Sequence, residues 1–129
     1  MSITSIAGKL FVPRQKELQQ YQNGAEEMQD EVLKYLVNTA ASTEYGRNHL
    51  FKTIHSYDDF AKNVPLNTYE ELKGDIDRMR HGESDILWPG SVKWYAKSSG
   101  TTNDKSKFIP VSHDGLQRVH YQGGKDVVA

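Results

Sequence analysis

Only two stretches of this sequence have the composition of β-strands: VKWYAK at residues 92–97 and KFIPV at residues 107–111. β-branched and aromatic residues favour strands, and Pro110, which has no N–H to donate, places the second strand at a sheet edge. A two-stranded hairpin is not stable alone in water. The two strands must therefore pack on helices or belong to a larger sheet.

The connection between the two strands is rich in hydrogen-bond donors. Residues 98–107 read SSGTTNDKSK, with hydroxyl side chains and lysines around Gly100. Backbone N–H groups in a glycine-containing turn form a concave anion site, to which hydroxyls and lysines add donors and charge. A glycine also lets the backbone approach an oxygen atom closely. The composition predicts a phosphate-binding loop, and a solvated hairpin loop is the alternative.

Two common nucleotide-binding motifs do not fit this loop. The motif G-x-x-x-x-G-K-[ST] needs a second glycine five residues after the first, and Lys105 stands five residues after Gly100. That motif also needs a helix directly afterwards, whereas a strand follows here. The G-x-G-x-x-G motif of dinucleotide-binding folds does not fit either.

Helical periodicity dominates the sequence before the hairpin. Apolar or small residues recur at steps of three and four, which predicts two helices over residues 14–22 and 24–41, with one long helix as the alternative. Asn23 and Glu26 have the spacing of a capping box that starts the second helix. The recurring residues are Leu18, Tyr21, Ala25, Met28, Val32, Tyr35 and Thr39.

Further helices are predicted between residues 43 and 82. TEYGRNHLF, at residues 43–51, indicates a short helical turn. Ser56 with Asp59 and Asn67 with Glu70 have capping-box spacing, and Gly82 ends the last of these helices. The residues expected to face inward are Tyr57, Phe60, Ala61, Leu72, Ile76 and Met79.

The predicted fold class is α+β, with several helices and one β-hairpin that carries the phosphate loop. The chain is expected to form a single unit over residues 1–129. We expect a helical part at residues 14–82, the hairpin with its loop at 91–111 and a truncated helix at 112–129.

Composition limits the function further. The 129 residues fit one domain, and a net charge of −1 hides a basic end, since residues 91–129 carry six basic and three acidic side chains. A local basic patch on a neutral protein favours a small anionic ligand over nucleic acid.

No run is long and apolar enough to span a membrane. The absence of cysteine excludes disulfides and is typical of a cytoplasmic protein. The five histidines have no metal-ligand spacing, so we expect no metal site.

Four motifs identify a family. TEYGRNHLF, SYDDFAKNVPLNTYEEL, GESDILWPG and KSSGTTNDKSKFIPVS, in this order, resemble the N-terminal part of the auxin-responsive promoter family of acyl-acid amido synthetases. The resemblance runs from about Arg14 to the end of the chain. Such enzymes belong to the adenylate-forming superfamily, and this part would lie in their large α/β domain.

The resemblance implies a reaction and a set of binding residues. Family members use ATP and Mg²⁺ to convert a small carboxylic acid to an acyl-adenylate, which the amine of an amino acid then attacks to give an amide. Asp104 stands where the family motif usually has a second glycine. No catalytic residue is assigned. The residues that fall on the family's first nucleotide motif, and would hold the ATP phosphates, are Ser98, Ser99, Gly100, Thr101, Thr102 and Lys107.

Family members are several times longer than this chain, so we expect an N-terminal fragment that is inactive alone. Missing partner elements would leave apolar side chains exposed, which predicts a homo-oligomer through edge pairing or swapping around the hairpin. The alternative function is a non-catalytic helical interaction module whose basic loop contacts an acidic partner. The side chains expected to be exposed are Tyr95, Phe108, Ile109, Val119, Val127 and Val128.

Overall fold

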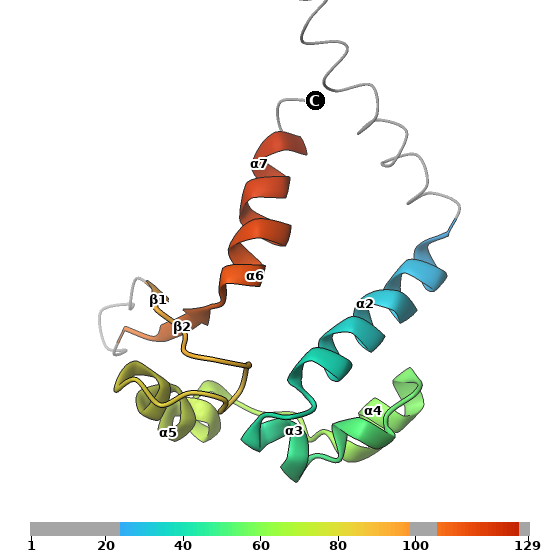
Figure 1. The fold of residues 1–129 in the computed structure, drawn as a ribbon, viewed down its shortest axis with the longest axis horizontal. Helices are drawn as coiled ribbons and strands as arrows, with labels where there is room; N and C mark the ends of the chain where they lie inside the picture. Colours follow the sequence, from blue (N-terminus) through green and yellow to red (C-terminus); the bar gives the residue numbers. More distant parts are fainter. Residues whose placement is uncertain (1–23, 99–105, 127–129) are drawn as a thin grey trace, which may run out of the picture.

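A computed structural model describes residues 24–98 and 106–126 and has an α+β fold, as predicted (Figure 1). Two helical arms, α2 and the continuous helix α6–η2–α7, rise from a base formed by α3, α4 and α5 (Figure 1). None of the helices in the described part of the chain is long and apolar enough to cross a membrane. In chain order the elements are α2 (Ala25–Ala40), α3 (Glu44–Asn48), the 3₁₀ turn η1 (Phe51–Thr53), α4 (Tyr57–Asn63), α5 (Tyr69–Arg80), β1 (Trp94–Lys97), β2 (Phe108–Val111), α6 (His113–Gly115), the π-helical turn η2 (Leu116–Tyr121) and α7 (Gln122–Asp126).

The core consists of two small clusters of buried side chains. The first joins the end of α2 to the turn after α3, and the second joins the end of α5 to the segment that leads into the hairpin. Trp88 from that same segment packs on the first cluster, so one stretch of chain contacts both. The first cluster consists of Val37, Ala40, Phe51 and Ile54, and the second of Met79, Ile86 and Val92.

A close approach of two backbones fixes the junction between α2 and α3. The Thr43 side chain, fully buried, donates to the Ala40 carbonyl at 2.7 Å and accepts from the Gly46 N–H at 3.0 Å. A Cβ atom on Gly46 would lie only 2.1 Å from the Ala40 carbonyl oxygen. Glycine is therefore required at residue 46 of the predicted helical turn.

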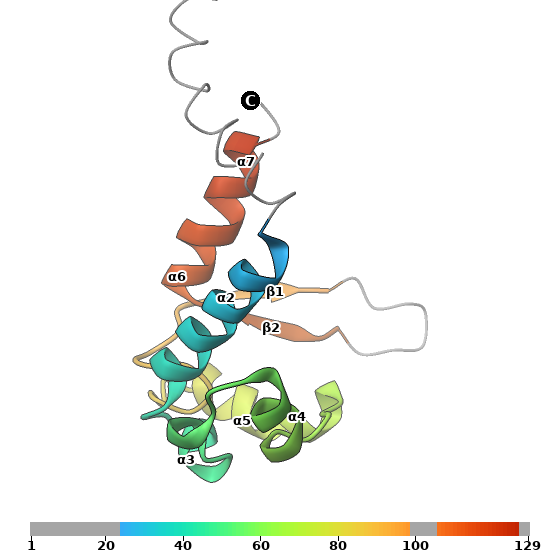
Figure 2. The ribbon, with the colours of Figure 1, turned by 90° about the vertical axis from the view of Figure 1, so that its right-hand side faces the viewer.

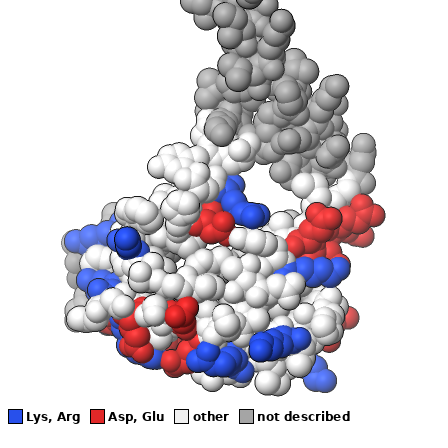
Figure 3. Space-filling view, in the orientation of Figure 1, with Lys and Arg blue, Asp and Glu red and all other residues white. Residues whose placement is uncertain are grey.

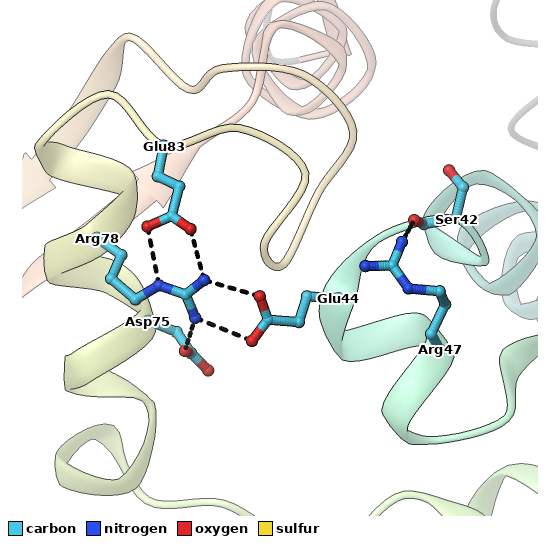
Figure 4. A network of polar contacts seen from close by, with 6 residues as sticks. All are labelled: Ser42, Glu44, Arg47, Asp75, Arg78 and Glu83. Carbon is cyan, nitrogen blue, oxygen red and sulfur yellow. Dashed lines mark hydrogen bonds and ion pairs between the residues drawn. The ribbon is translucent and has the colours of Figure 1, made fainter.

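A charged network joins α3 to α5 (Figure 4). The Arg78 guanidinium contacts both carboxylate oxygens of Glu44, at 2.7 and 2.9 Å, and both of Glu83, at 2.6 and 2.9 Å. Asp75 contacts the same guanidinium at 3.3 Å. Hydrogen bonds from Arg78 hold the pKa values of the Glu44 and Glu83 carboxyl groups below the usual range for glutamate. Beside this network, the Glu44 N–H donates to the Asp85 carbonyl at 2.7 Å.

The C-terminal arm contacts α2 through three side chains. Tyr35 of α2 donates its hydroxyl proton to Asp114, and Arg118 contacts the other Asp114 oxygen at 3.2 Å. The Arg118 guanidinium also lies 4.1 Å from the centre of the Tyr35 ring. The helix predicted from Ser112 is confirmed, with the Ser112 hydroxyl as its N-terminal cap. The π-helical turn that follows was not predicted.

The starts of α2 and α5 differ from the two capping boxes predicted with an asparagine. Helix α2 begins after Gly24, which provides no side-chain cap, and Asn23 lies outside the described residues. Helix α5 is capped by Thr68 with Glu71, rather than by Asn67 with Glu70. The Asn67 amide instead donates to the Tyr45 hydroxyl and the Pro65 carbonyl.

The predicted cap at Ser56 is confirmed, since its hydroxyl accepts from the Asp59 N–H at 3.2 Å. In that helix Phe60 faces the core, but Tyr57 and Ala61 are exposed, contrary to the prediction. In α5 the predicted Ile76 and Met79 are buried and Leu72 is half-buried. Gly82, with a φ of 94°, ends that helix as predicted. The predicted helix at 14–22 lies outside the described residues.

Replacing Gly46 with alanine should destabilise the fold by more than about 1 kcal/mol, because the new methyl group meets a backbone carbonyl that cannot move away cheaply. Gly74, inside α5, has open space around its missing Cβ. Gly74→Ala is the matched control and should stabilise the protein by about 0.5–1 kcal/mol through higher helix propensity. Urea unfolding of both variants measures the change in the free energy of unfolding, which should be negative for Gly46→Ala and positive for Gly74→Ala. Equal changes in the two variants would contradict this role of Gly46.

Replacing Arg78 with glutamine should lower the thermal midpoint, because three carboxylates lose their shared cation. Since the pKa values of Glu44 and Glu83 are lowered on folding, the folded state binds fewer protons than the unfolded state. The network's contribution is therefore complete above about pH 4.3, the ordinary pKa of glutamate, and is lost as the pH falls through the lowered values.

The difference in midpoint between the native protein and Arg78→Gln should accordingly be full at neutral pH and shrink in strong acid. Lys34→Gln, which removes an exposed pair with Asp30, is the control and should change the midpoint little. If the difference in thermal midpoint stayed constant from neutral pH into strong acid, the Glu44 and Glu83 carboxylates would not be the groups that Arg78 stabilises.

Candidate functional site

The two predicted strands form an antiparallel hairpin. Residues that face each other across the ladder are Trp94 and Val111, Tyr95 and Pro110, Ala96 and Ile109, and Lys97 and Phe108. Opposite residues share one face of the sheet. Tyr95, Lys97, Phe108 and Pro110 thus lie on one face, and the other four residues lie on the opposite face.

Two of the predicted phosphate-binding residues meet where the ladder ends. The Ser98 N–H donates to the Lys107 carbonyl at 2.9 Å, and the Lys107 N–H donates to the Ser98 hydroxyl oxygen at 3.0 Å. The Ser98 side chain thus replaces its own carbonyl as an acceptor and closes the base of the connection. The other predicted members of the site, Ser99, Gly100, Thr101 and Thr102, lie outside the described residues.

Helix α5 positions this end of the hairpin. The Tyr69 hydroxyl, in the first turn of α5, accepts the Phe108 N–H at 3.0 Å. The Lys107 ammonium lies 5.5 Å from the centre of the Tyr69 ring, and the Arg80 guanidinium lies 3.8 Å from the centre of the Phe108 ring. Neither Tyr69 nor Arg80 was predicted from the sequence as part of the site. The available signal was weak: an aromatic residue follows the capping Thr68.

The charges around the hairpin favour an anionic ligand. In Figure 3, lysine and arginine lie on the side of the molecule that carries the hairpin in Figure 1 and also along the base, and acidic side chains lie over the first half of α2 and over part of the base. The described hairpin residues, 91–98 and 106–112, include Lys93, Lys97 and Lys107 and no carboxylate. A phosphate at the hairpin end would therefore meet positive charge.

Two hollows in the described part of the chain differ from the hairpin end, because no basic side chain lines them. A groove of about 520 Å³ lies between α2 and α4, and its lining is apolar apart from polar residues of α2 that include Glu26 and Asp30. A smaller cavity of about 270 Å³ lies beneath the hairpin, and Ser112 is its single polar lining residue. Neither hollow has a lysine or arginine in its lining, so the hairpin end fits phosphate better.

The side chain of Tyr95 packs against the second core cluster. Its hydroxyl oxygen is buried and has no hydrogen-bond partner among the residues that the structure describes, and burial raises the pKa of the phenol. Among residues 24–98 and 106–126, no group of three His, Asp or Glu side chains could hold a metal ion.

Comparison with known proteins identifies the family. Residues 14–127 match the GH3 family N-terminal domain. The chain is similar to the indole-3-acetic acid-amido synthetase GH3.15 of Arabidopsis thaliana, with 33% identity over 78% of this chain and 17% of the relative. The 4-substituted benzoates-glutamate ligase GH3.12 of the same plant is 29% identical over 83% of this chain and 19% of its own length.

A third relative, the probable indole-3-acetic acid-amido synthetase GH3.2 of Oryza sativa subsp. japonica, is 26% identical over 88% of this chain and 20% of its own length. The chain spans about a fifth of the length of these relatives. The resemblance found in the four sequence motifs is confirmed. This chain belongs to the GH3 family, and it matches that family's N-terminal domain.

Proposed function

We propose that this chain is the part of an ATP-dependent acyl-acid amido synthetase that binds the phosphates of ATP at the end of its hairpin. The observation that carries the proposal is the direct pairing of Ser98 and Lys107 at the base of the connection. These two residues stand at the two ends of the stretch that resembles the family's first nucleotide motif. The fold brings them together across the ladder, although nine positions separate them in the sequence.

Each residue offers a different kind of contact to a phosphate. The Ser98 hydroxyl accepts the Lys107 N–H, so its own proton stays available for donation, since a hydroxyl is both an acceptor and a donor. The Lys107 ammonium adds a positive charge and up to three donors. The serines, threonines and lysine of residues 99–106 would complete the set, with Gly100 allowing the backbone to approach an oxygen.

These contacts suit adenylation. In that reaction a carboxylate oxygen bonds to the α-phosphorus of ATP, and the bond from this phosphorus to the bridging oxygen breaks to release pyrophosphate. Donors aimed at the departing phosphates stabilise the negative charge that accumulates there. The amine of an amino acid then bonds to the acyl carbon, AMP leaves with the electron pair, and the amine loses a proton. The described residues contribute binding and charge to the first step.

Mg²⁺, which adenylate-forming enzymes use with ATP, would supply charge neutralisation on the phosphates. The described residues offer no carboxylate cluster for it. We therefore assign no residue of this chain to the metal and derive no step through it.

The substrates are proposed only as classes. Relatives are named for indole-3-acetic acid in one case, and for 4-substituted benzoates and glutamate in another. Both names contain a small aromatic carboxylic acid, with an amido group in the first and glutamate in the second. We propose the same two substrate classes for the full enzyme: a small carboxylic acid and an amino acid.

Pyrophosphate should bind the chain and should bind Lys107→Ala more weakly. Removing one charge-assisted hydrogen bond costs about 1.5–3 kcal/mol, which corresponds to a roughly 10- to 150-fold rise in Kd. Gly100→Val should abolish binding by blocking the backbone. Lys62→Ala, which removes an exposed lysine of α4, is the matched control and should bind normally.

Isothermal titration with pyrophosphate, ATP and sulfate measures these affinities. Equal affinity of Lys107→Ala and the native chain would refute the assignment of the hairpin end. Equal affinity for sulfate and pyrophosphate would favour the alternative, an interaction module that binds any anion.

A protein of these 129 residues alone should not catalyse adenylation, because it corresponds to about a fifth of each synthetase that it resembles. Positioning of both reactants provides much of the rate in such reactions. The assay is exchange of labelled pyrophosphate into ATP with a panel of carboxylic acids, and a full-length relative serves as positive control. Robust exchange by the purified chain would show that it holds a complete site.

A further inference from the structure

Lys107, the cation of the candidate phosphate site, lies against helix α5. Lysine side chains are usually exposed, and Lys93 and Lys97 of the hairpin are exposed, but Lys107 is half-buried. Its ammonium lies 5.5 Å from the centre of the Tyr69 ring, within the distance of about 6 Å at which an aromatic face attracts a cation. Lys107 therefore differs from the other two lysines in being held by a neighbouring helix.

Tyr69 also holds the backbone beside that lysine. Its hydroxyl accepts the Phe108 N–H at 3.0 Å. Since Phe108 directly follows Lys107 in the sequence, one tyrosine contacts the backbone of the first and the side chain of the second. Figure 2 shows β2 on the side of the hairpin nearer to α5, where both contacts form.

The start of α5 fixes Tyr69 itself. Tyr69 is the first residue of that helix and directly follows the capping residue Thr68. The Glu71 carboxylate accepts the Thr68 N–H at 2.6 Å, which completes the capping box. A tyrosine has only two side-chain torsions and is therefore a rigid contact surface. The ring thus offers Lys107 a support whose backbone position is set by the helix.

An aromatic ring suits this role better than a carboxylate. A carboxylate beside Lys107 would compete with a phosphate for the ammonium, because both are anions. An aromatic ring attracts a cation through its quadrupole and carries no net charge. The contact with Tyr69 therefore orients the ammonium without neutralising it.

The packing of the hairpin on α5 corrects a prediction from the sequence. Phe108 and Tyr95, expected to be exposed, are half-buried against α5 and the second core cluster. Ile109 and Val119 are exposed, as expected. The homo-oligomer predicted around the hairpin stays a prediction. Two further residues expected to be exposed lie outside the described part of the chain: Val127 and Val128.

We propose, on the basis of the proposed function, that Tyr69 is a positioning residue for phosphate binding. Its hydroxyl fixes the start of β2 through the Phe108 N–H, and its ring holds the Lys107 ammonium at the hairpin end. Tyr69 acts through these two residues and need not touch the ligand. Without it the hairpin end would have more arrangements, and a ligand binds more weakly when only a fraction of the molecules has the competent one.

Three variants of the full chain separate the two contacts. Tyr69→Phe removes the hydrogen bond and keeps the ring, and Tyr69→Leu removes both. Tyr57→Phe is the matched control, because Tyr57 is the first residue of α4, directly follows the capping Ser56 and is 69% exposed. In titrations with pyrophosphate, Kd should rise roughly 2- to 10-fold for Tyr69→Phe. It should rise about 2- to 5-fold further for Tyr69→Leu and stay unchanged for Tyr57→Phe.

The dependence on Lys107 distinguishes positioning from a purely structural role. In the Lys107→Ala background the ring has no ammonium to hold, so Tyr69→Leu should bind pyrophosphate no more weakly than Tyr69→Phe does. General loss of stability would separate these two variants equally with and without the lysine. If Tyr69→Leu does not fold, Tyr69→Phe still tests the hydroxyl contact, because hydrogen exchange of the Phe108 amide should become faster.

NMR of the free chain tests the ring contact without a ligand. Nuclear Overhauser effects should connect the methylene protons of Lys107 with the ring protons of residue 69, both in the native chain and in Tyr69→Phe. Their absence from the native chain would overturn the proposal. An equal step from Tyr69→Phe to Tyr69→Leu with and without Lys107 would overturn it as well.

Failure of this proposal can be distinguished from failure of the proposed function. If the native chain binds pyrophosphate, Lys107→Ala binds it more weakly and both Tyr69 variants bind like the native chain, the positioning role is wrong and the phosphate site stands. If the native chain does not bind pyrophosphate, both are wrong.

Discussion

A two-stranded sheet needs a packed face, and in this protein the packed face of the hairpin rests on α5. Phe108 makes the connection in two ways: its N–H donates to the Tyr69 hydroxyl, and its ring lies under the Arg80 guanidinium. The first contact comes from the beginning of α5 and the second from its end. One helix therefore sets both the position and the tilt of the strand that leads out of the candidate phosphate loop.

The position of α5 depends in turn on the rest of the helical base. Its capping box, Thr68 with Glu71, fixes where the helix begins, and Arg78 joins its last turns to Glu44 of α3. Helix α3 is held against the end of α2 by the close approach at Gly46. The charged pairs are partly exposed and contribute modestly. The buried side chains of the two clusters provide most of the stabilisation.

Features set by neighbours in the sequence could be predicted. The two strands, the buried Ile76 and Met79, and the end of α5 at Gly82 all follow local patterns, and the structure confirms them. The cap of α5 could not be chosen locally, because Asn67 with Glu70 and Thr68 with Glu71 have the same spacing. Tertiary contacts decide between them, since the Asn67 amide bonds to the Tyr45 hydroxyl, 22 residues away.

In the candidate site, too, local features could be predicted and tertiary contacts could not. The hairpin was predicted from its two strands, but the contact between Ser98 and Lys107 at its end was not. Tyr69 contacts Phe108 across 39 residues, and no local pattern indicates that contact. Phosphate binding at this hairpin end is tested most directly by NMR titration with pyrophosphate. We expect the largest amide shifts at Ser98 and Lys107, with little change along α2. Shifts confined to α2 and α4, or none at saturating pyrophosphate, would contradict it.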